Sequence, residues 1–178
     1  LCAFRVSDFL RGLLVPWLVL LAACASPPVQ FEPVPPASVV LVIGDSLVAG
    51  TGAMPAQAWP QVLAEQTGWQ VVNAGIPGNK SADALRRLPA LLARHRPAAV
   101  IIAVGGNDFL RGVRSAVTRR QLQEMITLSR AASTHVALMA VPAPGLSAAF
   151  GQLDDHEMFA DLAEANALAL IPDAIADV

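Results

Sequence analysis

Five short runs of aliphatic, largely β-branched residues, separated by segments with helical spacing, constrain the fold of this chain most strongly. A continuous apolar run is typical of a strand that is buried on both faces. The five runs are Ser38–Ile43, Trp69–Asn73, Ala98–Val104, His135–Val141 and Leu168–Ile171. Because strands and helices alternate along the chain, we expect an α/β fold in which helices cover both faces of a parallel sheet.

The segments between these runs predict the helices. Pro55–Gln66 has the apolar spacing of a helix. Ser81 is a candidate N-cap for the next helix, which Pro89 should kink or split. Thr118 is a candidate cap for a third helix, and the acidic pair Asp154-Asp155 suits the start of a fourth.

The loops that follow the first three runs carry glycine and polar residues. Right-handed crossovers bring the carboxyl ends of parallel strands to one edge of a sheet, so these loops should meet there. The loops are Gly44-Asp45-Ser46-Leu47, Asn73-Ala74-Gly75-Ile76-Pro77-Gly78 and Gly105-Gly106-Asn107-Asp108. Together they offer a hydroxyl, a glycine amide and a side-chain amide, which supply the nucleophile and the oxyanion donors that acyl transfer needs.

Each loop taken alone also has a structural explanation. Ser46 could cap a helix, Gly75 could permit a tight turn, and the Asn107 side chain could bond its own backbone. The first loop is not the G-x-S-x-G elbow of α/β-hydrolases, because Val48 stands where that motif has its second glycine. Neither a G-x-G-x-x-G nor a Walker sequence occurs, so nucleotide binding has no support. It is the combination of three such loops at three strand ends that favours catalysis.

With these loops, the sequence resembles the SGNH, or GDSL, hydrolase family over about residues 39–178. The three loops match the first three sequence blocks of that family. The resemblance is closest to the thioesterase I/lysophospholipase L1 and arylesterase branch, through Ala58-Trp59-Pro60, Arg87-Leu88-Pro89-Ala90-Leu91-Leu92 and Leu110-Arg111-Gly112. It implies a flavodoxin-like three-layer αβα sandwich with a five-stranded parallel sheet, and a serine esterase or thioesterase.

The resemblance also implies catalytic roles for three residues. Ser46 would be the nucleophile, and its own N–H, the N–H of Gly75 and the side-chain amide of Asn107 would form the oxyanion hole. A helix that begins at Ser46 agrees with this, because free amides favour a developing negative charge. Asp45 and Asp108 are expected to accept loop amides rather than to react.

The general base is not found in the sequence. The family takes its base and the orienting carboxylate from one D-x-x-H block after the fifth strand, and none of the three histidines has an aspartate three residues earlier. The residues three positions before His95, His135 and His156 are Leu92, Ala132 and Leu153. His156, which has acidic neighbours, is the one substitute worth testing. We expect that the sequence stops short of this block; a non-catalytic member of the family is the alternative.

The first 26 residues predict a secretory signal of the lipoprotein type. Arg5 and Arg11 form a positive n-region, and an uncharged apolar run over residues 12–21 is too short to span a bilayer. The run ends in Leu21-Ala22-Ala23-Cys24, which resembles the lipobox of bacterial lipoproteins, whose cysteine is acylated. A plain signal peptide or an uncleaved membrane anchor is the alternative.

The expected organisation follows from this signal. Residues 1–23 would be the signal peptide, residues 24–37 the lipidated Cys24 with a proline-rich tether, and residues 38–178 the hydrolase domain. The domain would then be held in the bacterial cell envelope by its lipid and would face the periplasm.

Composition excludes other classes of function. The chain has 178 residues, a formal net charge of −2 and a pI near 5.9, which argues against nucleic-acid binding. A hydrophobic content of 54% excludes intrinsic disorder. Two cysteines are too few for a disulfide scaffold or a four-ligand zinc site, and we expect no cofactor and no metal. We expect a monomer that hydrolyses a small-molecule or lipid ester; a non-catalytic lipid-anchored binding protein and a carbohydrate O-deacetylase are the alternatives.

Overall fold

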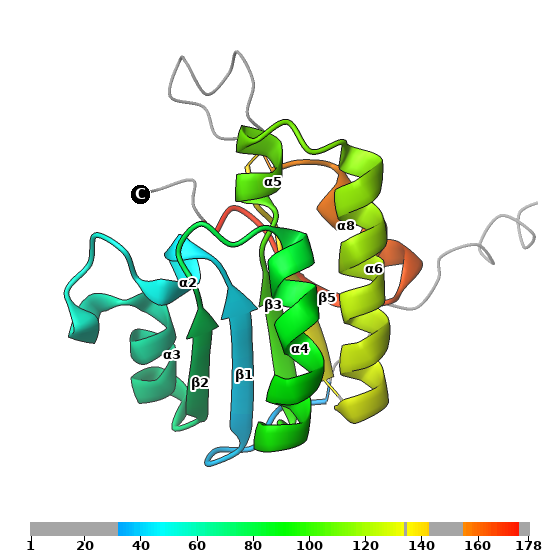
Figure 1. The fold of residues 1–178 in the computed structure, drawn as a ribbon. Helices are drawn as coiled ribbons and strands as arrows, with labels where there is room; N and C mark the ends of the chain where they lie inside the picture. The colour runs from blue at the N-terminus through cyan, green and yellow to red at the C-terminus, as the bar shows by residue number, and fades with distance from the viewer. Residues whose placement is uncertain (1–31, 134, 143–154, 175–178) are drawn as a thin grey trace, which may run out of the picture. The chain divides into compact units, whose positions relative to one another are not determined.

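The five predicted strands form one parallel sheet in the order β2-β1-β3-β4-β5 (Figure 1). The computed structural model describes residues 32–133, 135–142 and 155–174. The strands are β1 (Val39–Gly44), β2 (Gln70–Gly75), β3 (Ala99–Ala103), β4 (His135–Met139) and β5 (Ala169–Ile171). This order is that of the flavodoxin-like doubly wound sheet, so the predicted α/β sandwich is confirmed.

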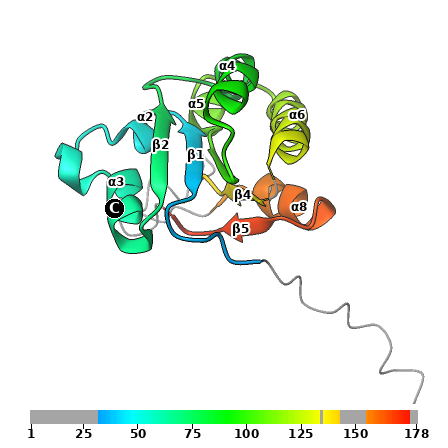
Figure 2. The same cartoon turned by 90° about the horizontal axis from the view of Figure 1, so that it is seen from below.

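Helices lie on both faces of the sheet. The helical elements are α2 (Ser46–Ala49), the 3₁₀ turn η3 (Pro55–Gln57), α3 (Trp59–Thr67), α4 (Ser81–His95), α5 (Gly106–Leu110), α6 (Ser115–Ala132) and α8 (Met158–Ala165). α4, α6 and α8 pack on one face and α3 packs on the other (Figures 1 and 2). The two faces follow from right-handed crossovers, because the chain moves one way from β1 to β2 and the opposite way from β2 through to β5.

The alternating side chains of β1 explain why its sequence is apolar throughout. Leu41 and Ile43 enter the core under α4 and α6, whereas Val40 and Val42 enter the core on the α3 side. All four are 0% exposed. Because successive side chains of a strand point to opposite faces, a central strand covered on both sides has no polar position to offer.

Two of the predicted helix caps are wrong, and both residues do something else. Ser81 is the first residue of α4 rather than its cap, and Thr118 lies inside α6, which begins three residues earlier. Both side chains are buried and donate hydrogen bonds to the carboxylate of Asp108. A partner distant in sequence thus replaces the local backbone partner that a cap would have.

Other helix boundaries also differ from prediction. The first predicted helix is divided at Ala58, whose extended backbone separates η3 from α3. Pro89 does not split α4, which continues through it to His95. Pro89 is exposed, so the carbonyl that loses its amide partner can be solvated there. The last helix begins at Met158 rather than near Asp154-Asp155, and Asp154 is outside the described residues.

The described contacts of the domain begin earlier than the predicted boundary at residue 38. The backbone oxygen of Val34 accepts a hydrogen bond of 3.1 Å from Trp69 Nε1, and the N–H of Ala37 donates to the backbone oxygen of Gly68. The predicted signal peptide and Cys24 lie outside the described residues. In the described ranges, no helix has the length and apolar character needed to cross a membrane.

Candidate active site

The three loops singled out in the sequence lie at one edge of the sheet. Gly44, the last residue of β1, is paired with Gly75 at the end of β2 and with Ala103 at the end of β3. The loops that follow these strands therefore leave the sheet side by side. This confirms that the loops of Ser46, Gly75 and Asn107 share one edge.

Asp45 joins the first loop to the third. Its side chain is 2% exposed; Oδ1 accepts a hydrogen bond of 3.0 Å from the N–H of Leu47, and Oδ2 accepts one of 3.3 Å from Asn107 Nδ2. Burial raises the pKa of this carboxyl group, and the bonds from Leu47 and Asn107 oppose the rise. One carboxylate thus both caps α2 and holds Asn107 next to the turn that carries Ser46.

Ser46 is the first residue of α2 and is half-buried. The hydroxyl of Ser46 makes no hydrogen bond to any described residue, and its N–H is one of the free donors at the start of a helix. α2 has only four residues, so its macrodipole is small. A negative charge developing near Ser46 would therefore be stabilised mainly by a hydrogen bond from the N–H itself. A side chain at Gly44 would overlap Val48 and the backbone oxygen of Ala103, which explains the glycine before the Asp-Ser pair.

Gly75 permits a close approach between β2 and α2. A Cβ atom built on Gly75 would lie 2.8 Å from the oxygen of Asp45, 2.7 Å from the carbonyl carbon of Val48, and closer still to the backbone nitrogen of Ala49. The N–H of Gly75 donates a hydrogen bond of 2.9 Å to Asn73 Oδ1, while Asn73 Nδ2 donates one of 2.8 Å to the oxygen of Val48. The N–H of Gly75 is thus already bonded within the loop and is not free to bind an oxyanion in this arrangement. The role of Gly75 as an oxyanion donor stays a prediction.

Gly78, unlike Gly75, has a backbone N–H that is free to donate a hydrogen bond. Residues Ile76-Pro77-Gly78-Asn79 form a turn in which the N–H of Asn79 bonds the oxygen of Ile76 at 3.1 Å, and Gly78 has φ +77°. Proline second and a glycine with positive φ third are typical of a type II turn, which leaves the N–H of the glycine free. No described residue accepts a hydrogen bond from the Gly78 N–H. The Pro-Gly pair in the sequence was the signal that could have pointed to this amide.

Asn107 lies between the other two loops. Its Nδ2 donates to Asp45 Oδ2 and also to the backbone oxygen of Asn79, at 3.1 Å. The Asn107 side chain is therefore in contact with the backbone of Asn79, the residue that follows Gly78. A developing oxyanion at this place would share one of the two Nδ2 hydrogens, and the longer bond to Asp45 is the easier one to share.

Asp108 anchors the third loop to the helices. Its carboxylate is 1% exposed and accepts hydrogen bonds from the N–H of Ser81 at 2.8 Å, from the Ser81 hydroxyl and from Thr118 Oγ1 at 3.3 Å. These three donors, two from Ser81 in α4 and one from Thr118 in α6, fix the residue that follows Asn107. Both carboxylate oxygens of Asp108 accept hydrogen bonds, so its role is structural, as the sequence predicted.

None of the three histidines, all of which are described, is paired with a carboxylate. His95 ends α4, and His135 begins β4 at the opposite edge of the sheet. His156 precedes α8 rather than lying in its first turn; its Nδ1 accepts a hydrogen bond of 3.2 Å from the N–H of Met158, and its ring stacks on Phe109 at 4.6 Å. The general base thus stays unassigned.

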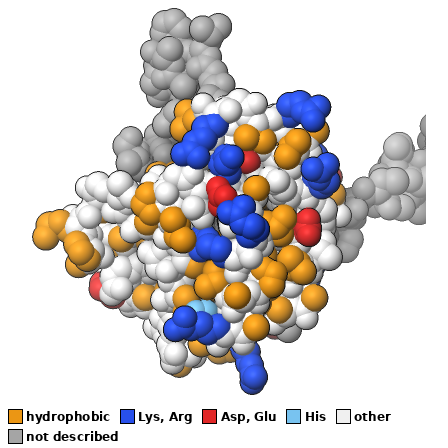
Figure 3. Space-filling model, viewed as in Figure 1, with side chains coloured by type: hydrophobic (Ala, Val, Ile, Leu, Met, Phe, Trp, Pro, Cys, Tyr) orange, Lys and Arg blue, Asp and Glu red, His pale blue; other side chains and the backbone are white. Residues whose placement is uncertain are grey.

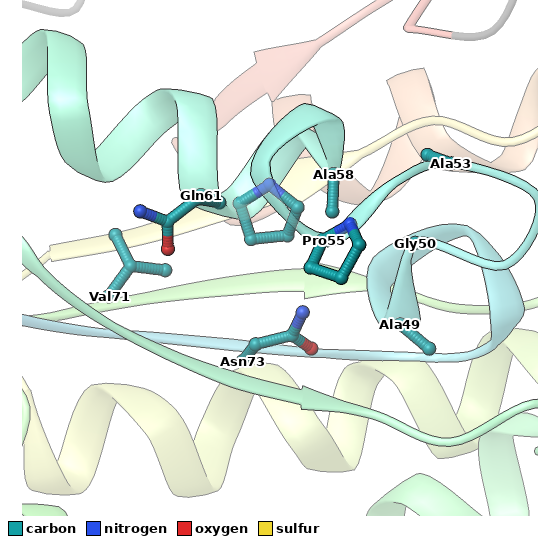
Figure 4. Close-up of a pocket in the computed structure, with 9 residues that line it drawn as sticks. Ala49, Gly50, Ala53, Pro55, Ala58, Gln61, Val71 and Asn73 are labelled. Atoms are coloured by element: carbon teal, nitrogen blue, oxygen red, sulfur yellow. The ribbon is translucent and has the colours of Figure 1, made fainter.

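Two cavities border α2. The first, of about 370 Å³, is mainly apolar and reaches Leu47, the residue after Ser46; it is lined by Leu47, Gly50, Thr51, Ala53, Gln57, Ala58, Trp59, Ala103, Met139, Val141 and Ala174. The second is a groove of about 270 Å³ between α2, α3 and β2, where the Asn73 side chain faces Pro55 and Ala58 (Figure 4). The amide of Asn73 is already bonded on both sides, so this groove offers few free polar groups.

The apolar residues next to the three loops differ in their exposure. Leu47 and Trp59 line the first cavity, and Trp59 Nε1 bonds the oxygen of Leu47 at 3.1 Å. Ile76 and Leu110 are exposed at the loops, with 42% and 75% of their surface accessible. Val48, in contrast, is 0% exposed and belongs to the core. The described residues contain no group of three metal-ligating side chains.

Comparison with known proteins identifies a family. The model of the GDSL-like lipase/acylhydrolase family matches residues 42–171. The chain is 41% identical over 113 residues to esterase TesA of Pseudomonas aeruginosa, and 40% identical over 112 residues to thioesterase 1/protease 1/lysophospholipase L1 of Escherichia coli. Each match covers 61% of this chain, and 56% and 53% of those proteins respectively. The chain therefore spans about half the length of the curated relatives it matches.

The fold comparison gives the same result. A crystal structure of TesA superposes with a TM-score of 0.66 at 35% identity, and the match covers 74% of this chain and 76% of that one. AlinE4, an esterase of the SGNH-hydrolase family, superposes with a TM-score of 0.67 at 27% identity, covering 79% and 78% of the two chains.

Proposed function

The chain belongs to the GDSL-like lipase/acylhydrolase family, and from this premise we propose that it hydrolyses carboxylic ester or thioester bonds through an acyl-enzyme on Ser46. The observation that carries the proposal is the pair of hydrogen bonds to Asp45, one from the turn of Ser46 and one from Asn107. Through this one carboxylate, a free hydroxyl and a side-chain amide are held next to each other. The names of the relatives, an esterase and a thioesterase/lysophospholipase, support the same class of reaction.

The reaction proceeds in two steps. Ser46 Oγ attacks the carbonyl carbon of the substrate as its proton passes to a base, and the carbonyl oxygen takes the negative charge. The charged intermediate then collapses, breaks the bond to the alcohol or thiol, and leaves the acyl group on Ser46. Water attacks this ester in the second step, releases the acid and restores the hydroxyl.

The oxyanion is stabilised by three donors. These are the N–H of Ser46, the side-chain amide of Asn107 and one glycine amide of the second loop. Gly78 suits the third position better than Gly75, because its N–H is unbonded and the following residue accepts from Asn107. Donors that are fixed before the reaction need no reorganisation when the charge forms.

The substrate has an apolar part next to the ester. The mainly apolar cavity beside Leu47 and Trp59 supports an acyl or aryl group of modest size, and the exposed Ile76 and Leu110 offer further apolar contact. Lysophospholipids and aryl esters both have this character. A panel of acetyl, butyryl, octanoyl and palmitoyl esters of one chromogenic alcohol would measure the preferred length.

Substitution of Ser46 tests the proposed reaction. In the full-length protein, Ser46→Ala should abolish hydrolysis of a chromogenic ester, whereas Ser115→Ala, at an exposed serine that starts α6, should not. Undiminished turnover in Ser46→Ala would contradict the role of Ser46. A protein that hydrolyses none of the esters, including acetylated sugars, would instead favour the non-catalytic binding protein.

We also propose that the domain is tethered to the bacterial cell envelope, on its periplasmic side, by a lipid on Cys24. The support is the sequence alone: a positive n-region, an apolar run of signal length, and small residues before the cysteine. Fatty-acid labelling of cells should mark the wild-type protein and the Cys2→Ser variant but not Cys24→Ser. Label that persists in Cys24→Ser would refute the anchor.

A further inference from the structure

Arg87, in the middle of α4, reaches the ends of two strands and the loop after the second. Its Nη1 donates a hydrogen bond of 3.1 Å to the oxygen of Ala74, and its Nη2 lies 3.5 Å from the oxygen of Gly44. Nε and Nη2 together hold Asn79 Oδ1, at 3.1 and 2.8 Å. A single planar guanidinium group therefore links β1, β2 and the turn that ends at Asn79.

The contact with Asn79 continues into the proposed oxyanion site. The side chain of Asn79 is held by Arg87, and its backbone oxygen accepts the hydrogen bond from Asn107 Nδ2. Asn107 in turn bonds Asp45, which caps the helix of Ser46. The path from Arg87 to the turn of Ser46 thus runs through these hydrogen bonds and through the intervening atoms of Asn79, Asn107 and Asp45.

In the part of the chain that the structure describes, the guanidinium of Arg87 forms no ion pair with a carboxylate. The ion pairs among the described residues are Arg86–Asp83 and Arg119–Asp161, and the partners of Arg87 are neutral carbonyl and amide oxygens. Burial lowers the pKa of the guanidinium, with Asp83 opposing it, but an arginine stays protonated in proteins. Basic side chains gather on the surface around α4, with few acidic ones between them (Figure 3). Arg87 is partly buried, and a desolvated cation held by neutral oxygens lacks the carboxylate that would offset the cost of its burial.

We propose that Arg87 is a positioning residue for catalysis: its fork-shaped guanidinium fixes the Ile76–Asn79 turn, and through it the Gly78 amide and Asn107, relative to Ser46. This inference rests on the proposed hydrolysis by Ser46. Lysine cannot replace the arginine, because one ammonium group cannot hold Asn79 Oδ1 from two nitrogens and reach Ala74 as well.

Three variants of the full-length protein test this role, with kcat, KM and the unfolding temperature measured for each. Arg87→Lys should lower kcat by about 10- to 100-fold and leave KM within about 2-fold, because a misplaced donor acts on the transition state more than on bound substrate. Asn79→Ala should lower kcat in the same way. Arg86→Lys is the matched control, since Arg86 is the adjacent residue, is exposed, and its side chain has Asp83 as its one hydrogen-bond partner among the described residues; its kcat should be unchanged.

A residue that serves stability alone would behave differently. If Arg87→Lys is folded at the assay temperature and keeps the parent kcat, the inference is overturned. If Arg87→Lys does not fold, Asn79→Ala decides, since a parent-like kcat there would overturn it equally. Guanidinium ions added to Arg87→Ala should restore part of kcat, and ammonium ions should not. Activity that survives in Ser46→Ala would overturn the proposed function instead, so the two failures are distinguishable.

Discussion

Gly75→Ala tests the packing that holds the nucleophile in place. The new Cβ would lie within 2.8 Å of three backbone atoms, in Asp45, Val48 and Ala49. Backbone atoms cannot rotate away as a side chain can, so either β2 or α2 must move. Overpacking costs about 1–3 kcal/mol, and three simultaneous backbone contacts place this substitution near the upper end, at about 3 kcal/mol.

The measurement is thermal and urea unfolding of the parent and the variant. For a domain of this size, about 3 kcal/mol corresponds to a fall in Tm of roughly 6–12 °C. Hydrolysis should also fall at temperatures where the variant is folded, because α2 carries Ser46 at its start. Gly75→Ala is thus expected to lower both the unfolding temperature and, through a displaced Ser46, the rate of hydrolysis.

The matched control is Gly106→Ala in the third loop. A Cβ there would meet no atom within 4 Å, and Gly106 is not among the glycines with positive φ. We expect its unfolding free energy to stay within about 0.5 kcal/mol of the parent. A Gly75→Ala protein with a parent-like Tm would refute the reasoning, because it would mean that β2 and α2 are not in the close contact described.

Three further substitutions probe the network around the site. Asn107→Ala removes an oxyanion donor and should lower kcat by about 10²–10³-fold; steady-state kinetics with a near-parent kcat would argue against Asn107. Ser81→Ala removes the hydroxyl that donates to the buried carboxylate of Asp108, while the backbone N–H bond to the same carboxylate remains; it should cost about 1–3 kcal/mol in urea unfolding, a cost that Ser115→Ala should not show. Asp45→Asn should change the pH dependence of stability. The folded-state pKa of Asp45 is raised by burial, so its contribution to stability is complete below its ordinary value of 3.8 and is lost as pH rises through the raised value. The unfolding free energy of Asp45→Asn, relative to the parent, should therefore rise over that range, and a difference that is the same at every pH would contradict the shift.

Strands were predictable because their signal is local. All five strands begin within one residue of the predicted start, because short β-branched runs such as Val39–Ile43 are typical of strands buried on both faces. The convergence of the three loops followed from the parallel arrangement of the strands, whose carboxyl ends all lie at one edge of the sheet. These features do not depend on which distant residue each side chain meets.

Caps and donors were less predictable because their partners are distant in sequence. Ser81 and Thr118 have the chemistry of caps, but both bond Asp108, which is 27 and 10 residues away. Gly75 and Gly78 are equally plausible amide donors in a sequence. Only the hydrogen bond from Gly75 to Asn73 separates them. Arg87 stands in a stretch that resembles the family, but its contacts could not be predicted from that stretch, because its partners are two backbone oxygens and Asn79.

Covalent labelling with an alkyl phosphonate ester is the most direct test of the proposed chemistry. The reagent reacts with an activated serine and remains attached, so mass spectrometry of the digested full-length protein can locate it. We predict one adduct, on the peptide that contains Ser46, formed at the rate at which ester hydrolysis is lost, and no adduct in Ser46→Ala. Loss of hydrolysis with the label on any other residue would contradict the assignment of Ser46 as the nucleophile.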